Sequence, residues 1–159
     1  MSFEKIKYSS DQELKDAVSK EMEKQFVDLR PEQIRGMFRY KAGDCSLEKE
    51  EVAIEMLLDY RFENLFGITH GGALTWAQDV GMASTIRAFY KIDTTPTASI
   101  SIKFYKKCSS EDKLVFRGRV IKIEGSRVTV HGELWRGDEL CSETEGVYVA
   151  QAKGFKMLV

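Results

Sequence analysis

The apolar and polar residues in the first part of the chain alternate with the period of an α-helix. Apolar side chains recur at intervals of three and four from residue 10 to residue 29, with Asp, Glu and Lys between them. Ser9 or Ser10 is placed to cap the first turn, and Glu13 completes a capping box with Ser10. Pro31 then breaks the pattern. This spacing predicts an amphipathic helix that packs on another part of the molecule.

The period changes beyond residue 46. Apolar residues at every second position from Val52 predict a half-buried strand that ends near Phe62. A long apolar run then extends from Gly71 to about residue 90, and between residues 64 and 86 only His70 and Asp79 carry ionisable side chains. A helix that is apolar nearly all round is buried on most sides, so we expect this one at the centre of the fold.

The last third of the chain has the pattern of four strands. Short glycine-containing turns at residues 125–126 and 137–138 separate three of them, which favours antiparallel hairpins because a parallel crossover needs a dozen or more residues. Together with the central helix, they predict an α+β architecture in which a curved antiparallel sheet wraps around a helix. The predicted strands are residues 99–105, 113–123, 127–136 and 139–150.

The chain length of 159 residues suits one domain with one core. We divide it into an N-terminal helical extension, residues 1–45, and a main domain, residues 46–159. We expect the extension to cover a sheet edge or the mouth of a pocket.

Composition excludes several classes of function. With 24 Lys+Arg against 25 Asp+Glu, the chain is not a strongly basic nucleic-acid binder, and no apolar run is long enough to span a bilayer. The N-terminus has no secretory signal pattern. Cys45, Cys108 and Cys141 lie far apart without CxxC spacing, which argues against a disulfide framework or a zinc site and predicts a reduced, cytoplasmic protein.

Asp79 is the first residue with candidate chemistry. A carboxylate inside an apolar helix costs several kcal/mol to desolvate unless it is paired, hydrogen-bonded or open to water. One interpretation places it on a solvent-facing stripe of the helix beside Gln78. The other places it at the wall of a cleft as a general base or nucleophile.

The second feature is the run His70-Gly71-Gly72, where a loop enters the helix. The first backbone N–H groups of a helix have no intrahelical partners, and glycine lets a ligand approach them, so they can stabilise a developing oxyanion. A turn with His70 as a polar cap is the alternative. Asn64, six residues earlier, can orient a water or a carbonyl, or simply form a turn. Together with Asp79, the set favours hydrolysis of an activated acyl group over redox or phosphoryl chemistry.

These residues resemble a known family signature. The spacing Asn64-x-x-Gly67-x-x-His70-Gly71-Gly72, with Asp79 nine residues after His70, is similar to the hotdog-fold acyl-CoA thioesterases of the PaaI-like, acyl-CoA thioesterase 13-like group. The resemblance covers about residues 50 to 150. It implies a hotdog fold, a homodimer or dimer of dimers with active sites at the subunit interface, and hydrolysis of a fatty or aromatic acyl-CoA.

The resemblance also implies residue roles. Asp79 activates water or attacks the thioester, the Gly71 backbone N–H polarises the carbonyl, Asn64 positions the water or the carbonyl, and His70 holds the loop and the substrate end. Asp79 faces Asn64 and Gly71 of the other subunit. No cofactor and no metal are expected, because a thiolate leaves readily and needs no strong acid.

Two further parts of the site follow from the same resemblance. A Ser or Thr early in the strand after the helix often holds the water, and here Thr97 is put forward although Ala98 or Ser99 is one residue away. Trp76 is expected to narrow the acyl pocket or to pack in the core.

The CoA phosphates call for nearby basic groups. The candidates for CoA binding are Gly72, Lys106, Lys107, Lys122 and Arg127, although Lys and Arg are also routine on exposed strands and turns. The chain has no Walker A motif and no GxGxxG.

Two alternative functions stay open at this stage. One is a non-catalytic acyl-CoA-binding module on the same fold. The other is a hotdog dehydratase or hydratase, which is disfavoured because that branch carries prolines around its catalytic histidine and neither Pro31 nor Pro96 is near His70.

Overall fold

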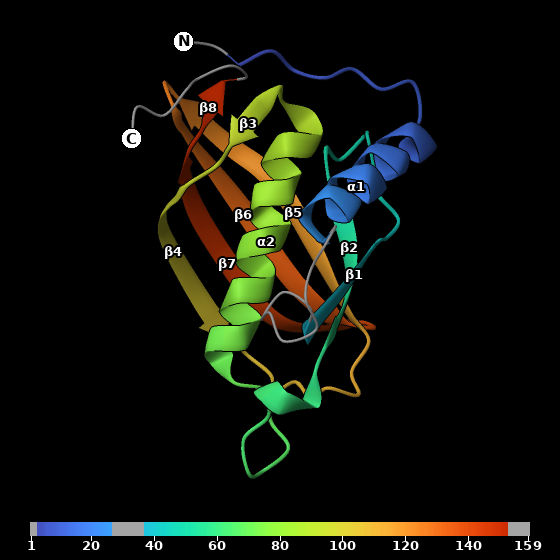
Figure 1. The fold of residues 1–159 in the computed structure, drawn as a ribbon, viewed down its shortest axis with the longest axis vertical. Coiled ribbons are helices and arrows are strands. Elements are labelled where there is room, and N and C mark those ends of the chain that lie inside the picture. The colour runs from blue at the N-terminus through green and yellow to red at the C-terminus, as the bar shows by residue number, and fades with distance from the viewer. Residues whose placement is uncertain (1–2, 27–36, 153–159) are drawn as a thin grey trace.

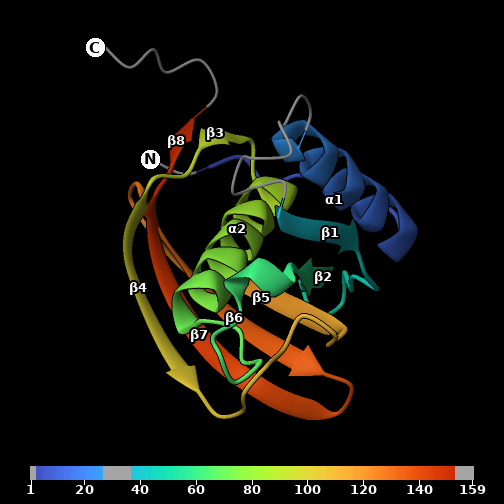
Figure 2. The same cartoon turned by 60° about the horizontal axis from the view of Figure 1, so that its bottom comes forward.

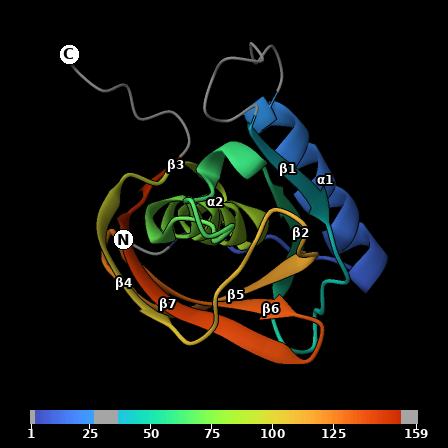
Figure 3. The same cartoon turned by 90° about the horizontal axis from the view of Figure 1, so that it is seen from below.

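The computed structural model describes residues 3–26 and 37–152. A six-stranded sheet curves around one long helix, α2 (Gly71–Phe89), which Figure 3 shows almost end-on inside the curve. The strand order is β1-β2-β5-β6-β7-β4, and every neighbouring pair is antiparallel. The strands are β1 (Phe38–Ala42), β2 (Val52–Leu58), β4 (Thr97–Phe104), β5 (Leu114–Glu124), β6 (Arg127–Arg136) and β7 (Glu139–Val149). The predicted α+β architecture is therefore present.

Helix α1 (Asp11–Phe26) begins where the sequence predicts. The Ser10 hydroxyl accepts a hydrogen bond from the backbone N–H of Glu13 at 3.2 Å, while the Glu13 carboxylate accepts one from the backbone N–H of Ser9 at 2.6 Å. Leu14 and Val18 are fully buried, and α1 packs beside α2 and β1 (Figure 1). The predicted end of this helix, at Leu29 and Pro31, lies outside the described residues.

Strand β1 pairs with β2, so the sheet already includes residues from the predicted N-terminal extension. The strand predicted to end near Phe62 stops at Leu58. A short 3₁₀ turn, Tyr60–Phe62, follows it because Asp59 caps the chain there, its side chain accepting the backbone N–H of Arg61. A small two-stranded ribbon of β3 (Ile92–Thr94) and β8 (Gln151–Ala152) stands at the far end of α2 (Figure 2).

The core lies between α2 and the concave face of the sheet. Gln78 of α2 is fully buried, so the interpretation that placed Asp79 beside it on a solvent-facing stripe is wrong for Gln78. Its side-chain oxygen accepts hydrogen bonds from Ser142 at 3.1 Å and Thr144 at 2.6 Å, so this polar group is satisfied inside the core.

In the part of the chain that the structure describes, no helix is long and apolar enough to cross a membrane.

Candidate active site

Asp79 lies half-buried near the middle of α2, where two hydroxyl groups hold its carboxylate. Its Oδ1 atom accepts a hydrogen bond from Thr97 Oγ1 at 3.0 Å and another from Tyr148 Oη at 2.8 Å. Tyr148 is fully buried, and burial, followed by the negative charge of Asp79, raises its pKa well above the usual value. The phenol therefore stays a hydrogen-bond donor, and the two bonds fix the orientation of the carboxylate.

Thr97 reaches Asp79 because of an irregularity in strand β4. Thr97 lies opposite Tyr148 on β7, whereas Ser99 lies opposite the adjacent residue Val147, so Ala98 is an extra residue in a β-bulge. The bulge places the Thr97 and Tyr148 hydroxyls side by side on Asp79. Of the three residues considered from the sequence, Thr97 is the one that contacts the carboxylate.

A cavity of about 740 Å³ opens beside Asp79. This volume lies within the range of about 300–1,000 Å³ typical of small-molecule sites. Trp76 lines the cavity and packs edge-on against Phe38, with ring centroids 4.2 Å apart, so its predicted packing role is confirmed. The remaining lining residues are Glu21, Lys24, Val80, Ala83, Arg87 and residues 92–97.

Helix α1 forms one wall of this cavity through Glu21 and Lys24, in agreement with the expectation that the N-terminal extension covers a pocket. The Arg87 guanidinium of α2 forms an ion pair with Glu21 and donates to Thr95 Oγ1 at 2.7 Å. These contacts tie α1, α2 and the start of the β3–β4 connection together at the end of the cavity away from Gly71.

The loop before α2 has its own internal structure. The Asn64 side-chain oxygen accepts hydrogen bonds from the backbone N–H groups of Phe66 at 2.9 Å and Ile68 at 3.2 Å. Gly67 in the same turn has a φ of 68°, which glycine adopts without strain. Asn64 therefore uses its side-chain oxygen to hold the loop, which is a structural role.

Gly71 and Gly72 begin α2 and are both exposed. The first N–H groups of a helix have no partner within it, which leaves these two amides without an intrahelical acceptor. His70 occupies the N-cap position, but its side chain forms no capping hydrogen bond, which is contrary to its role as a polar cap. The ring of Phe104 stands against Gly71, where an added Cβ would come within 3.3 Å of it.

The predicted residues form two groups within one chain. Asp79 meets Thr97 and Tyr148, whereas Asn64, His70, Gly71 and Gly72 gather at the start of α2. Asp79 lies eight positions after Gly71 along the helix, a rise of about 12 Å. A single chain therefore does not bring the carboxylate and the amides onto one thioester.

The predicted CoA-binding residues also divide between the two ends of the sheet. Lys106 and Lys107 follow β4 at the end where the Phe104 ring lies against Gly71. The Lys106 Nζ atom lies 3.4 Å from Glu139 Oε1. Lys122 and Arg127 flank the β5–β6 turn at the opposite end. Only the first pair lies near the exposed amides of its own chain.

Sequence reasoning missed Tyr148. Its place in the alternation of β7 predicts only a buried aromatic residue. The Tyr148 hydroxyl reaches Asp79 because β7 and the bulged strand β4 lie against the helix. A local sequence pattern does not predict such a contact.

Comparison with known proteins adds an independent observation. Residues 66–142 match the profile of the Thioesterase superfamily. No curated protein sequence gives a match. The fold is similar to that of the Escherichia coli PaaI protein from the phenylacetic acid degradation operon, with a TM-score of 0.68 and 12% identity over 87% of this chain and 96% of that one.

Two streptococcal structures are similar as well. The protein smu.793 from Streptococcus mutans, bound to acetyl CoA, has a TM-score of 0.65 and 16% identity over 80% of this chain and 97% of that one. A hypothetical thioesterase from Streptococcus pneumoniae, solved with coenzyme A, has a TM-score of 0.64 and 15% identity over 72% of this chain and 87% of that one.

Proposed function

We propose that this chain, which carries a thioesterase-superfamily domain on a hotdog fold as the sequence predicted, hydrolyses an acyl-CoA thioester to the free acid and CoA. The observation that carries the proposal is the Asp79 carboxylate, held by Thr97 and Tyr148 at the wall of a cavity of about 740 Å³. A fixed carboxylate beside a cavity of this size suits a general base or nucleophile.

The chemistry follows from the two groups of residues. Asp79 takes a proton from water, which attacks the thioester carbonyl, or Asp79 itself attacks that carbon and water then hydrolyses the acyl-enzyme anhydride. In both routes the carbonyl oxygen becomes an oxyanion, and the backbone N–H of Gly71 stabilises it. The C–S bond breaks, and CoA leaves as a thiolate, whose proton comes from solvent.

The solved relatives support the choice of substrate and residues. Two of them hold acetyl CoA or coenzyme A. The pneumococcal thioesterase has also been solved as an Asp-to-Ala variant and as a Thr-to-Ala variant. Those residue types are the pair that meet at Asp79 and Thr97 in this chain.

We further propose that two chains complete each site. Strand β4 forms an edge of the sheet and is mostly exposed, so its backbone is open to pairing with β4 of a second copy. Leu65 and Phe66 in the loop before α2 are also almost fully exposed, which is costly for a lone chain. A dimer through this edge would bring Gly71 and the predicted CoA-binding residues of the partner subunit toward Asp79; a dimer of dimers is compatible with it.

All three cysteines are free and buried, which supports the predicted cytoplasmic location.

The function is tested by a thiol-release assay over short, long and aromatic acyl-CoA esters. We expect at least one class to be hydrolysed with a kcat/KM of about 10⁴ M⁻¹s⁻¹ or more. Tight binding in calorimetry without thiol release from any ester would contradict the enzyme and favour the acyl-CoA-binding module. Water addition to crotonyl-CoA, without thiol release, would favour the hydratase.

The shared site is tested with mixed dimers purified through two different affinity tags. A dimer of one Asp79→Asn chain and one Asn64→Ala chain keeps one intact site, so we expect about half of the wild-type activity although each homodimer is nearly inactive. The matched control is a dimer of one wild-type chain and one chain with both substitutions. It has one defective part in each site and is expected to be nearly inactive. The opposite result in the two dimers would place each complete site within one chain.

A further inference from the structure

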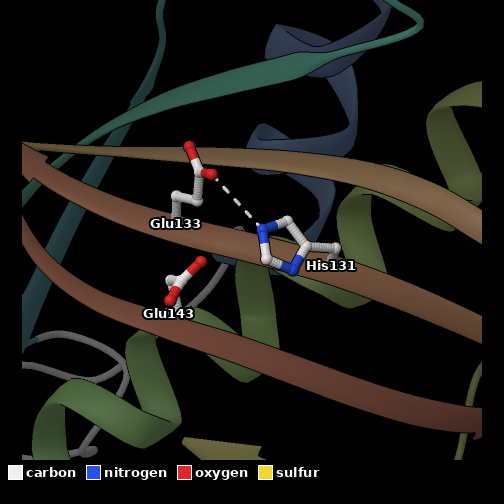
Figure 4. A group of neighbouring side chains, drawn as sticks. All are labelled: His131, Glu133 and Glu143. Atoms are coloured by element: carbon white, nitrogen blue, oxygen red, sulfur yellow. Dashed lines mark hydrogen bonds and ion pairs between the residues drawn. The ribbon is translucent and has the colours of Figure 1, made fainter. Parts of the chain in front are cut away.

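A second cluster of chemically active side chains lies on the outer face of the sheet, away from α2. His131 and Glu133 project from β6, and Glu143 projects from the neighbouring strand β7 toward them (Figure 4). One ligand atom from each residue lies within 4.8 Å of the others, and all three residues are half-buried. The thioesterase mechanism uses none of them.

The two glutamates are direct cross-strand neighbours, which is unfavourable for like charges. Among residues 3–26 and 37–152, no lysine or arginine forms an ion pair with Glu133 or Glu143. The arginines at neighbouring positions on β5 are engaged elsewhere: Arg117 pairs with Glu51 at 2.7 Å and Arg119 with the same carboxylate at 3.9 Å. Lys103 on β4 lies directly opposite Glu143 but forms no ion pair with it, so His131 is the only basic side chain of the described residues that pairs with a carboxylate of the cluster.

The geometry of the cluster suits a metal ion. His131 Nε2 lies 3.3 Å from Glu133 Oε1, and two ligands about 2.0 Å from a tetrahedral Zn²⁺ lie about 3.3 Å from each other. Neighbouring side chains orient both carboxylates, because Trp135 Nε1 donates to Glu133 Oε2 at 2.9 Å and the Tyr105 hydroxyl donates to Glu143 Oε2. Such outer hydrogen bonds are what orient the ligands of a metal site.

We propose that His131, Glu133 and Glu143 bind one first-row divalent transition-metal ion such as Zn²⁺, with water in the remaining positions. One imidazole and two carboxylates favour such an ion over Ca²⁺ or Mg²⁺, which take oxygen ligands. A hollow of about 260 Å³ beside the cluster, lined in part by Lys103 and Glu145, gives the ion and its water access. The bound ion links β6 to β7, removes the repulsion between the glutamates and stabilises the sheet.

The test is zinc titration of tag-free protein by calorimetry and thermal unfolding. We expect one Zn²⁺ per chain and a rise in Tm of about 5 °C at a 100-fold excess over Kd. His131→Ala and Glu143→Gln are each expected to weaken zinc binding at least tenfold. His70→Ala is the matched control, since His70 is the only other histidine in the chain, and it should bind zinc like the wild type.

Glu143→Gln provides a second readout with the opposite sign. Because it removes a like charge and keeps the side-chain shape, we expect the metal-free variant to unfold at a higher temperature than the metal-free wild type. The proposal is overturned if zinc leaves the Tm of the wild type unchanged. It is equally overturned if His131→Ala binds zinc as the wild type does, or if His70→Ala is the variant that loses binding. Thioesterase activity enters none of these measurements, so they stand apart from the proposed function.

Discussion

Replacing Asp79 with asparagine is expected to lower kcat/KM for the best acyl-CoA ester by about 10³-fold or more, because the substitution removes the proposed base or nucleophile of the reaction. The asparagine oxygen still accepts hydrogen bonds from Thr97 and Tyr148, the two groups that hold Oδ1. The position of Asp79 Oδ2 is then an NH₂ group, which neither accepts a proton nor attacks a carbonyl. The fold and the assembly are therefore expected to survive while turnover is lost.

The measurement is thiol release, with circular dichroism and gel filtration on the same samples. Asp138→Asn serves as the matched control, since Asp138 is exposed in the turn between β6 and β7. Its kcat/KM should stay within about twofold of the wild-type value, as expected of a surface change far from the site. A general base usually contributes at least about 10²-fold to the rate. If Asp79→Asn retains more than about a tenth of the wild-type rate, the loss is smaller than that, and Asp79 has neither proposed role.

Much of this fold was predictable because the elements that build it have strong periodic patterns. The central helix and four strands follow from apolar runs and from the short turns at residues 125–126 and 137–138. Strand β1 was missed because its five residues, FRYKA, are too few to show a period. The ribbon of β3 and β8 joins even shorter segments from distant parts of the chain.

The candidate site was predictable to a smaller degree. Asp79 attracted attention because it is the single carboxylate in an apolar helix, and that signal is local. Its contacts are not local. Thr97 and Tyr148 reach it through a bulge in β4 and the pairing of β4 with β7, which no short window of sequence reports. The same limit applies to His131 and Glu143, which meet only because their strands are adjacent.

The packing of Phe116 was also beyond sequence reasoning, although it governs the shape of the core. Its ring is fully buried between the sheet and α2. Three glycines make room for it: an added Cβ at Gly81 or Gly132 would lie 2.6 Å from the ring, and one at Gly118 would lie 2.7 Å from it. These distances are too short for any real Cβ, so the ring fills the space that the three missing side chains leave. From sequence alone, a glycine within a strand or helix indicates only that the element is locally destabilised.

Phe116→Ala is therefore expected to cost about 3–5 kcal/mol of the free energy of unfolding, a large part of the total for a domain of this size. Gly81, Gly118 and Gly132 contribute no side chain that could refill the cavity left by alanine, so the cost should fall toward the upper end of the range. Urea unfolding at a fixed protein concentration measures this cost, because the stability of the proposed dimer would depend on concentration. Ile121→Ala on the same strand is the control: Ile121 is 53% exposed, and its truncation should cost less than about 1 kcal/mol.

In a double-mutant cycle, Gly81→Ala should destabilise the wild type but be much better tolerated beside Phe116→Leu, because the methyl group then occupies space that the ring has left. Additive costs in that cycle would mean that Gly81 is small for a reason other than the ring.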